Sequence, residues 1–68
     1  MTPIDGSLLI KILCDNFGFM KVRQKGSPVT LQRNGTFVTV PVKEMRVGLL
    51  ARILKDCNIL RDEFLDSL

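Results

Sequence analysis

A turn signal, Asn34-Gly35, separates two runs of apolar and β-branched residues, and it constrains the fold more than any other feature of this 68-residue chain. Both turn residues tolerate positive φ, which a tight β-hairpin requires. Val29 to Gln32 on one side and Thr36 to Val40 on the other are therefore predicted to pair as antiparallel strands. Pro41 has no amide proton, so it ends the second of these strands or places it at a sheet edge.

Another strand is predicted ahead of the hairpin, where basic and apolar residues alternate. The alternation places Phe19, Lys21, Arg23 and Lys25 on one face, and Met20, Val22 and Gln24 on the other. This pattern predicts a sheet with one solvated, positively charged face. Gly26-Ser27-Pro28 ends the strand, because glycine permits a bend and proline has no amide to pair.

A helix is predicted before these strands, from about Asp5 to Asn16. Asp5 is suited to cap its N-terminus by accepting from the first backbone amides, and Thr2 ahead of Pro3 is an alternative start. Gly18 suits the left-handed conformation that ends a helix. An apolar stripe recurs at helical spacing and comprises Leu9, Ile12, Leu13 and Phe17.

Two more helices are predicted after the strands. The first runs from about Val47 to Cys57 and ends at Asn58, a residue that tolerates the left-handed conformation. A short terminal helix begins at about Arg61. The predicted buried residues of these helices are Leu50, Ile53, Leu54, Cys57, Phe64, Leu65 and Leu68. The resulting order, α-β-β-β-α, predicts an α+β fold in which the helices cover one face of a three-stranded antiparallel sheet and leave the other face open.

Length and hydropathy predict a single domain over residues 1–68, with 46% hydrophobic residues to form one core. A chain this short buries only about 60% of the surface of its extended form. No apolar run approaches 18 residues, so no membrane span is expected. The N-terminus lacks the basic start and small-residue cleavage site of a signal peptide, and we therefore expect a cytoplasmic protein.

The two cysteines, Cys14 and Cys57, have neither the spacing nor the histidine partners of a metal site. Both fall in predicted helices. The simplest interpretation is that they are buried, reduced thiols that pack as small hydrophobic residues. A Cys14–Cys57 disulfide and a catalytic thiol are the alternatives.

Charge is distributed unevenly around the net value of +3. Six of the ten Lys and Arg residues lie between residues 20 and 46, where Glu44 is the single acidic residue, whereas the flanking segments are acidic on balance. A basic centre between acidic ends is typical of a phosphate-binding face, and a solvated sheet face is the alternative explanation. The chain has no Trp or Tyr, so we expect recognition of phosphates and groove shape rather than stacking on aromatic rings.

The motifs of the chain resemble those of the HicA family of small toxins. The family pattern is a helix ending in Gly-Phe, a strand reading VRQKGSH, a VPVH segment, a Gly-x-Leu helix start and a closing EEFL segment. The matching residues are Gly18-Phe19, the run Val22-Arg23-Gln24-Lys25-Gly26-Ser27, Val40-Pro41-Val42, Gly48, Leu50, Ile53, Leu54, Glu63, Phe64 and Leu65.

The resemblance implies a fold like the double-stranded-RNA-binding domain and a toxin that cleaves messenger RNA without a metal or other cofactor. It also implies a HicB-type antitoxin as partner. The catalytic histidine of the family follows Gly-Ser, and this chain has Pro28 there. The family's second frequent histidine, after VPV, is replaced by Lys43, and the chain contains no histidine at all.

Metal-free RNA cleavage needs a base for the 2′-hydroxyl proton and an acid for the leaving oxygen, and a side chain with a pKa near 7 serves both best. Proline has no titratable group. The remaining candidates are Lys25 and Lys43, which can stabilise charge on the phosphate, Glu44 as a base, and Ser27 as a nucleophile that lacks an adjacent base.

Three hypotheses follow. The first is an RNA-binding HicA-like toxin, or a protein derived from one, whose endonuclease activity is weakened or lost. Its predicted RNA contacts are Lys21, Arg23, Lys25, Gly26, Ser27, Arg33, Lys43 and Arg46. The second is a non-catalytic module that binds an acidic or antitoxin-like protein. The third is a ribonuclease with a relocated active site.

Overall fold

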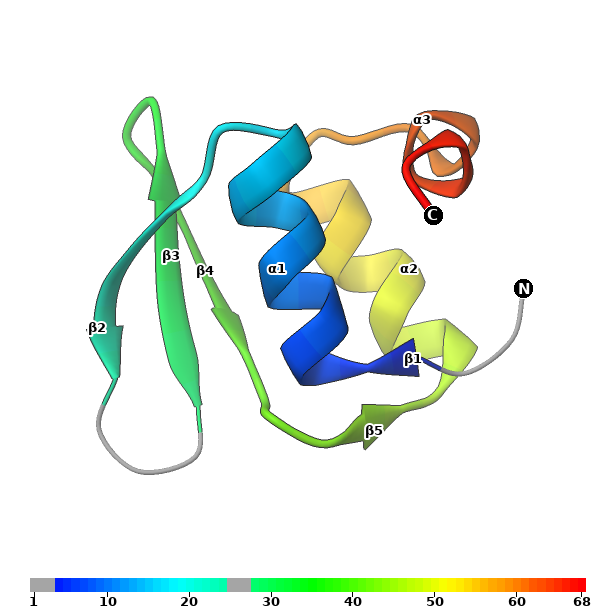
Figure 1. Cartoon of the computed structure of the whole chain (residues 1–68), viewed down its shortest axis with the longest axis horizontal. Coiled ribbons are helices and arrows are strands. Elements are labelled where there is room, and N and C mark those ends of the chain that lie inside the picture. Colours follow the sequence, from blue (N-terminus) through cyan, green and yellow to red (C-terminus); the bar gives the residue numbers. More distant parts are fainter. Residues whose placement is uncertain (1–3, 25–27) are drawn as a thin grey trace.

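The computed structural model describes residues 4–24 and 28–68, and its helices pack on one side of a three-stranded antiparallel sheet (Figure 1). In chain order, the elements are β1 (Ile4–Asp5), α1 (Gly6–Asn16), β2 (Met20–Gln24), β3 (Val29–Arg33), β4 (Thr36–Val40), β5 (Glu44–Met45), α2 (Val47–Asp56) and α3 (Arg61–Asp66). The predicted α+β class and the order α-β-β-β-α are confirmed. No helix in the described part of the chain is long and apolar enough to cross a membrane.

Local sequence signals set the ends of α1 as predicted. The Asp5 carboxylate accepts a hydrogen bond from the Ser7 amide at 2.7 Å, which satisfies one of the backbone donors that the first turn leaves without a partner. Gly18 adopts φ +75°, the left-handed conformation expected after the helix. Leu9 and Leu13 are fully buried on the helix face that meets the sheet.

The hairpin between β3 and β4 also follows the prediction. Asn34 and Gly35 have φ values of 49° and 81°, so both occupy the region that a two-residue hairpin turn requires. The pairing runs without interruption from Val29 opposite Val40 to Arg33 opposite Thr36. Val38 and Val40 are buried, whereas Phe37 and Thr39 point to the other side.

A β-bulge interrupts β2, and it overturns the predicted alternation of that strand. Lys21 lies opposite Leu31 and Arg23 lies opposite Thr30, so Val22 is an extra residue between them. Residues directly opposite one another share a face of the sheet. Because Leu31 is buried against the helices, Lys21 lies on the helix side and Arg23 on the open side.

The prediction that Phe19, Lys21, Arg23 and Lys25 form one positive face is therefore wrong for its described members. Phe19 is buried in the core instead. Met20 and Val22, expected on the apolar side, are 68% and 44% exposed. Lys25 lies outside the described residues.

Two short strands, β1 and β5, form a second sheet that the sequence does not predict, because a two-residue strand has no periodicity to detect. Ile4 pairs with Met45 and Asp5 with Glu44. The Gly6 amide donates to the Lys43 carbonyl at 2.8 Å. A β-carbon on Gly6 would overlap the carbonyl group of Pro41, so only glycine permits this approach.

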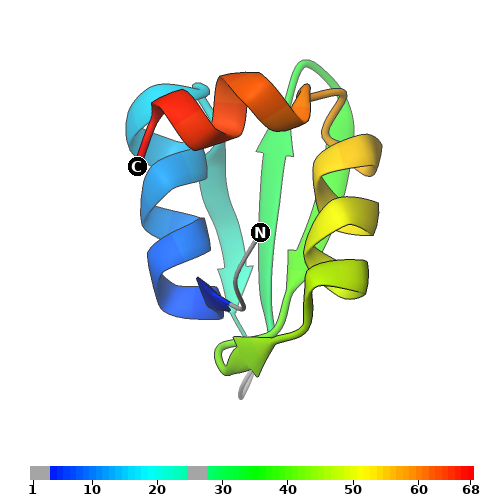
Figure 2. The same cartoon turned by 90° about the vertical axis from the view of Figure 1, so that its right-hand side faces the viewer.

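One apolar core joins the sheet to all three helices. Figure 2 shows α1 and α2 side by side in front of the sheet, with α3 crossing one end of both. Asn58, at φ 59°, ends α2 as predicted, and α3 begins at the predicted Arg61. The buried apolar residues are Ile4, Leu9, Ile12, Leu13, Phe19, Val29, Leu31, Val38, Val40, Met45, Leu50, Ile53, Leu54, Cys57, Ile59 and Phe64. Leu65 and Leu68, expected to close the core, are 38% and 67% exposed.

We predict that Gly6→Ala destabilises the fold by about 2–3 kcal/mol, because the added methyl group must displace the Pro41 backbone. Gly48→Ala is the matched control, since a β-carbon at Gly48 meets no neighbouring atom and α2 gains helix propensity. Urea unfolding followed by circular dichroism measures both. Equal stability of the two variants would show that the contact at Gly6 is unimportant.

A candidate nucleic-acid interface

A shallow hollow, which we call the β2 hollow, lies between the first turn of α1, the edge strand β2 and the segment after β4. Its volume is about 190 Å³, and it is lined by Ser7, Ile10, Lys21, Gln24, Val29 and Val42. The Lys21 ammonium donates to the Gln24 side-chain oxygen at 3.4 Å across its mouth. The bulge at Val22 creates this arrangement, because it returns both polar residues to the helix side of β2.

Pro28 and Lys43, the positions at which the resemblance implies histidine, lie at one end of the sheet. Pairing of Val29 with Val40 places Pro28, the residue before β3, level with Pro41, the residue after β4. Lys43 follows two residues later and is held there by the hydrogen bond from Gly6. We call this the Pro28 end of the sheet, and it is the lower end in Figure 1. Pro28 and Lys43 are both exposed.

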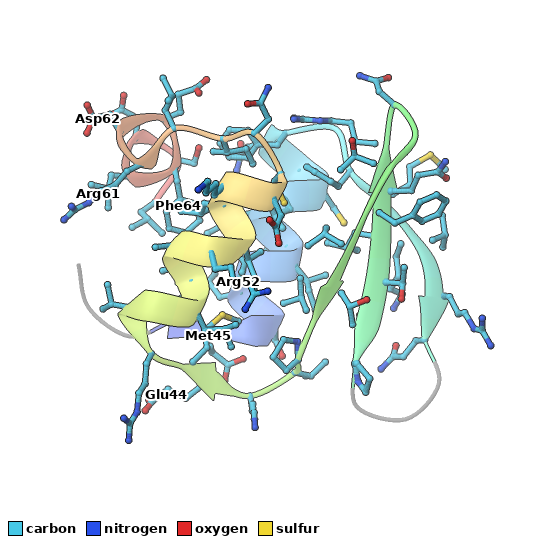
Figure 3. The ribbon with its side chains drawn as sticks, turned by 180° about the vertical axis from the view of Figure 1, so that it is seen from behind. Glu44, Met45, Arg52, Arg61, Asp62 and Phe64 are labelled. Carbon is cyan, nitrogen blue, oxygen red and sulfur yellow. The ribbon has the colours of Figure 1, made fainter. Side chains whose placement is uncertain are left out.

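Glu44 and Arg46 follow Lys43 closely in the chain, Glu44 as the first residue of β5. Figure 3 shows the Glu44 side chain directed outward from β5, away from the helices. Arg46 is the exposed residue immediately before α2. The sequence-predicted residues Lys25, Gly26 and Ser27 lie outside the described residues. The described candidates at this end are therefore cations and one carboxylate, all in contact with solvent.

Arg33 has a different environment from the other predicted RNA contacts. Its guanidinium donates to the Phe17 carbonyl at 2.9 Å and to the Cys57 carbonyl at 2.7 Å, and it lies 4.7 Å from the centre of the Phe19 ring. These carbonyls follow the ends of α1 and α2, where helices leave backbone acceptors without partners. Arg33 thus ties β3 to both helices, and we assign it a structural role.

The thiols occupy environments that disfavour the thiolate. Cys57 belongs to the core, and burial raises its pKa to about 11, against the opposing effect of Arg33. Cys14 is half-buried, and burial, together with nearby Asp15, raises its pKa as well. Both thiols are unpaired. Cys57 therefore packs as the small hydrophobic residue that was predicted. Within residues 4–24 and 28–68, no group of three His, Cys, Asp or Glu residues is arranged to hold a metal ion.

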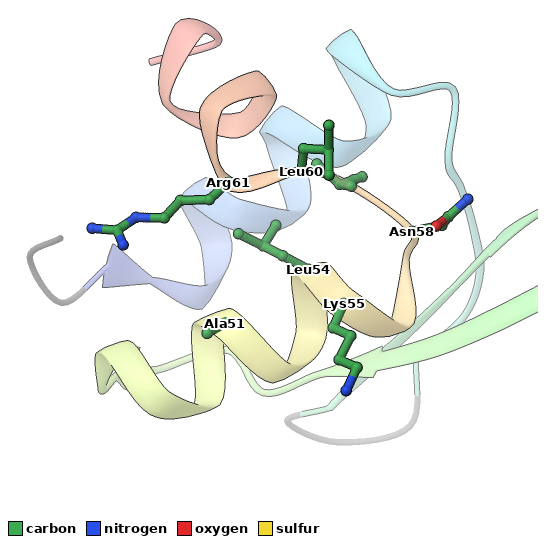
Figure 4. Close-up of a pocket in the computed structure, with 7 residues that line it drawn as sticks. Ala51, Leu54, Lys55, Asn58, Leu60 and Arg61 are labelled. Atoms are coloured by element: carbon green, nitrogen blue, oxygen red, sulfur yellow. The ribbon is translucent and has the colours of Figure 1, made fainter.

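A larger hollow of about 260 Å³ lies on the helical side, where α2 is followed by α3 (Figure 4). Ala51, Leu54, Ile59 and Leu60 make it mainly apolar, and Lys55 and Arg61 border it. Asp56 and Asp62 follow these two cations directly in the chain. The hollow brings together no acid–base pair, so it is a poorer candidate for chemistry than the Pro28 end.

The sequence model of the family described as the HicA toxin of bacterial toxin–antitoxin systems matches residues 6–59. The chain belongs to the HicA toxin family. The match extends from α1 through the loop after α2, so it includes the sheet and the Pro28 end. No curated protein matches the chain.

Sequence reasoning missed three features of this HicA-family site. Gly6 brings α1 next to Lys43, and Ser7 and Val42 line the β2 hollow. Gly6 and Ser7 carry no signal in the sequence, because each acts through a contact between distant segments, and the VPV match that includes Val42 does not reveal its place in the hollow. The run from Val22 to Gln24 was identified, but the bulge changes which side each member faces.

We predict that Arg33→Met destabilises the fold by about 2–4 kcal/mol, because two charge-assisted hydrogen bonds are lost while the aliphatic stem is kept. Arg23→Met is the matched control on the exposed open side and should change stability by about 0.5 kcal/mol or less. Chemical unfolding of both variants provides the comparison. A cost at Arg23 as large as that at Arg33 would refute the structural role.

We predict that iodoacetamide modifies Cys57 in the folded protein at pH 8 about 100-fold more slowly than in the urea-unfolded chain. A pKa of about 11, against 9.0 for an ordinary thiol, lowers the thiolate fraction by about this factor. Mass spectrometry of peptides containing Cys57 gives the rate.

The same pKa difference makes stability depend on pH. Below pH 9 the thiol is protonated in both states, and as pH rises from 9 towards 11 the unfolded chain loses its proton first, so stability falls. Cys57→Ala should show a smaller fall over this range. Rapid modification of folded Cys57, or identical pH profiles, would contradict the assignment.

Proposed function

We propose that this chain is an RNA-binding HicA-type toxin, or a protein derived from one, in which RNA cleavage is weakened or lost. A HicB-type antitoxin is its proposed protein partner. One observation carries the proposal: Pro28 and Lys43 take the family's two histidine positions and lie at the same end of the sheet. The cations of the binding surface are present, whereas the imidazole is missing.

The proposed RNA contacts are Lys21, which lines the β2 hollow, Lys43 at the Pro28 end, and Arg46 before α2, and all three are exposed. The resemblance adds three further proposed contacts, which are Lys25, Gly26 and Ser27. Arg23 points to the open side, so it can reach only a backbone that wraps around the β2 edge. Such a surface reads phosphates and shape, and its affinity falls steeply with salt.

The chemistry at the Pro28 end is limited by proton transfer. Pro28 can neither accept nor donate a proton, and losing positioned acid–base catalysis costs about 10²–10⁴-fold in rate. The Lys43 ammonium is suited to stabilise negative charge on a phosphate. Two carboxylates lie near Lys43, Glu44 and its strand partner Asp5. Asp5 already caps α1 by accepting from the Ser7 amide, so Glu44 is the candidate base. If the active site is relocated, we expect weak RNA cleavage in which Glu44 acts as the base.

We predict that Pro28→His raises RNA cleavage by about 100-fold or more over the wild-type chain, because an imidazole restores a base at the family position. Pro28→Ala is the control that removes the ring without adding a titratable group. Purified proteins are incubated with structured and single-stranded RNA, and fragments are counted by gel electrophoresis without added metal.

The outcomes separate the hypotheses. Wild-type binding that weakens with salt, with little cleavage, supports the proposal. Strong wild-type cleavage that Pro28→His leaves unchanged supports a relocated active site. Absence of RNA binding at low salt would defeat the RNA function. It would favour the second candidate, a protein-interaction module, which is supported by exposed Met20 and Phe37 on the open sheet face.

A further inference from the structure

The open face of the sheet carries large apolar side chains in contact with solvent. The register aligns Met20, Gln32 and Phe37 in one row across the three strands and Arg23, Thr30 and Thr39 in the next. Met20 is 68% exposed and Phe37 is 62% exposed. Figure 1 shows that none of the helices and strands in residues 4–24 and 28–68 covers this side. We call these two rows, together with Val22 at the bulge, the open-face patch.

The composition of the open-face patch is that of a protein interface. Aromatic residues, Met and Arg are enriched at interfaces, whereas Lys, Glu and Asp are depleted. Phe37, Met20 and Arg23 are of the enriched types. No Asp or Glu occurs between residues 16 and 43, so nothing on these strands neutralises Arg23. An acidic partner is the one that this charge favours.

Two other occupants fit the patch less well. A nucleic acid backbone needs several cations, but among the described cations of β2 and β3, Lys21 and Arg33 lie on the helix side and only Arg23 is on the open side. A second copy of this chain that docked through the same patch would bring another Arg23 and no carboxylate, so the contact would gain apolar area but oppose like charges.

We infer that the open-face patch docks an acidic protein, with apolar side chains of the partner on Met20 and Phe37 and a carboxylate on Arg23. The inference rests on the proposed function in taking the antitoxin as that protein. The inference assigns partner and RNA to different surfaces. The patch is on the open face of the sheet, whereas Lys43 lies at the Pro28 end and the β2 hollow lies on the helix side.

The probe is the protein encoded by the open reading frame adjacent to the gene of this chain, tested as the antitoxin, purified and titrated calorimetrically into the 68-residue chain. Phe37→Ser should weaken binding about 30-fold or more, the size expected for a central interface residue. Leu60→Ser is its matched control, because Leu60 is 69% exposed but lies at the α2–α3 hollow. Arg23→Glu should weaken binding at least tenfold, whereas Arg61→Glu should change it less than threefold.

Circular dichroism confirms that each variant is folded, and gel shifts with structured RNA give a second readout. We expect RNA affinity to survive Phe37→Ser. Equal losses of antitoxin affinity in Phe37→Ser and Leu60→Ser, an antitoxin that does not bind, or a wild-type dimer that Phe37→Ser dissociates would overturn the inference. Loss of RNA binding in Phe37→Ser alone would reassign the face to base stacking. If the wild type binds the antitoxin but never RNA, the RNA function fails while the docking surface stands.

Discussion

The close approach of Gly6 to the segment after β4 is the contact on which the rest of the site depends. Through it, the Gly6 amide reaches the Lys43 carbonyl, and β1 pairs with β5. The first turn of α1 and the Pro28 end of the sheet are thereby brought into one surface. Without a glycine at position 6, the Pro41 backbone would have to move, and the β2 hollow would lose one of its walls.

The two sides of the sheet use their charges differently. On the helix side, Arg33 satisfies two carbonyls near the helix ends, and Lys21 reaches the rim of the β2 hollow. On the open side, Arg23 is surrounded by apolar and neutral polar residues. The β-bulge is responsible for this division, because the extra residue places the side chains of Lys21 and Arg23 on opposite faces of the sheet. In this HicA-family chain, the basic residues of β2 and β3 therefore have three different environments. Arg33 bonds to the helix ends, Lys21 lines the β2 hollow, and Arg23 lies on the open face.

The chemistry of the protein follows from what its titratable groups can do near neutral pH. The raised pKa of Cys57 keeps its thiol protonated, and the chain has no imidazole. Lys43 and Glu44 are neighbours in the chain and both exposed, and the first is able to stabilise a phosphate and the second to accept a proton. Under the function proposed above, these groups let the chain hold RNA but leave it poorly equipped to cut it.

Local signals in the sequence determined the helices and strands, because each depends on neighbouring residues. Asp5 caps α1, Asn34-Gly35 makes the hairpin, and Asn58 ends α2, all as predicted. The face assignment of β2, the pairing of β1 with β5 and the internal role of Arg33 were decided by the tertiary structure. Each arises from contacts between segments far apart in the chain, such as Gly6 with Lys43 or Arg33 with Cys57. A sequence pattern reports the periodicity of one segment, but it does not contain the register between segments, and that register decides where each charge points.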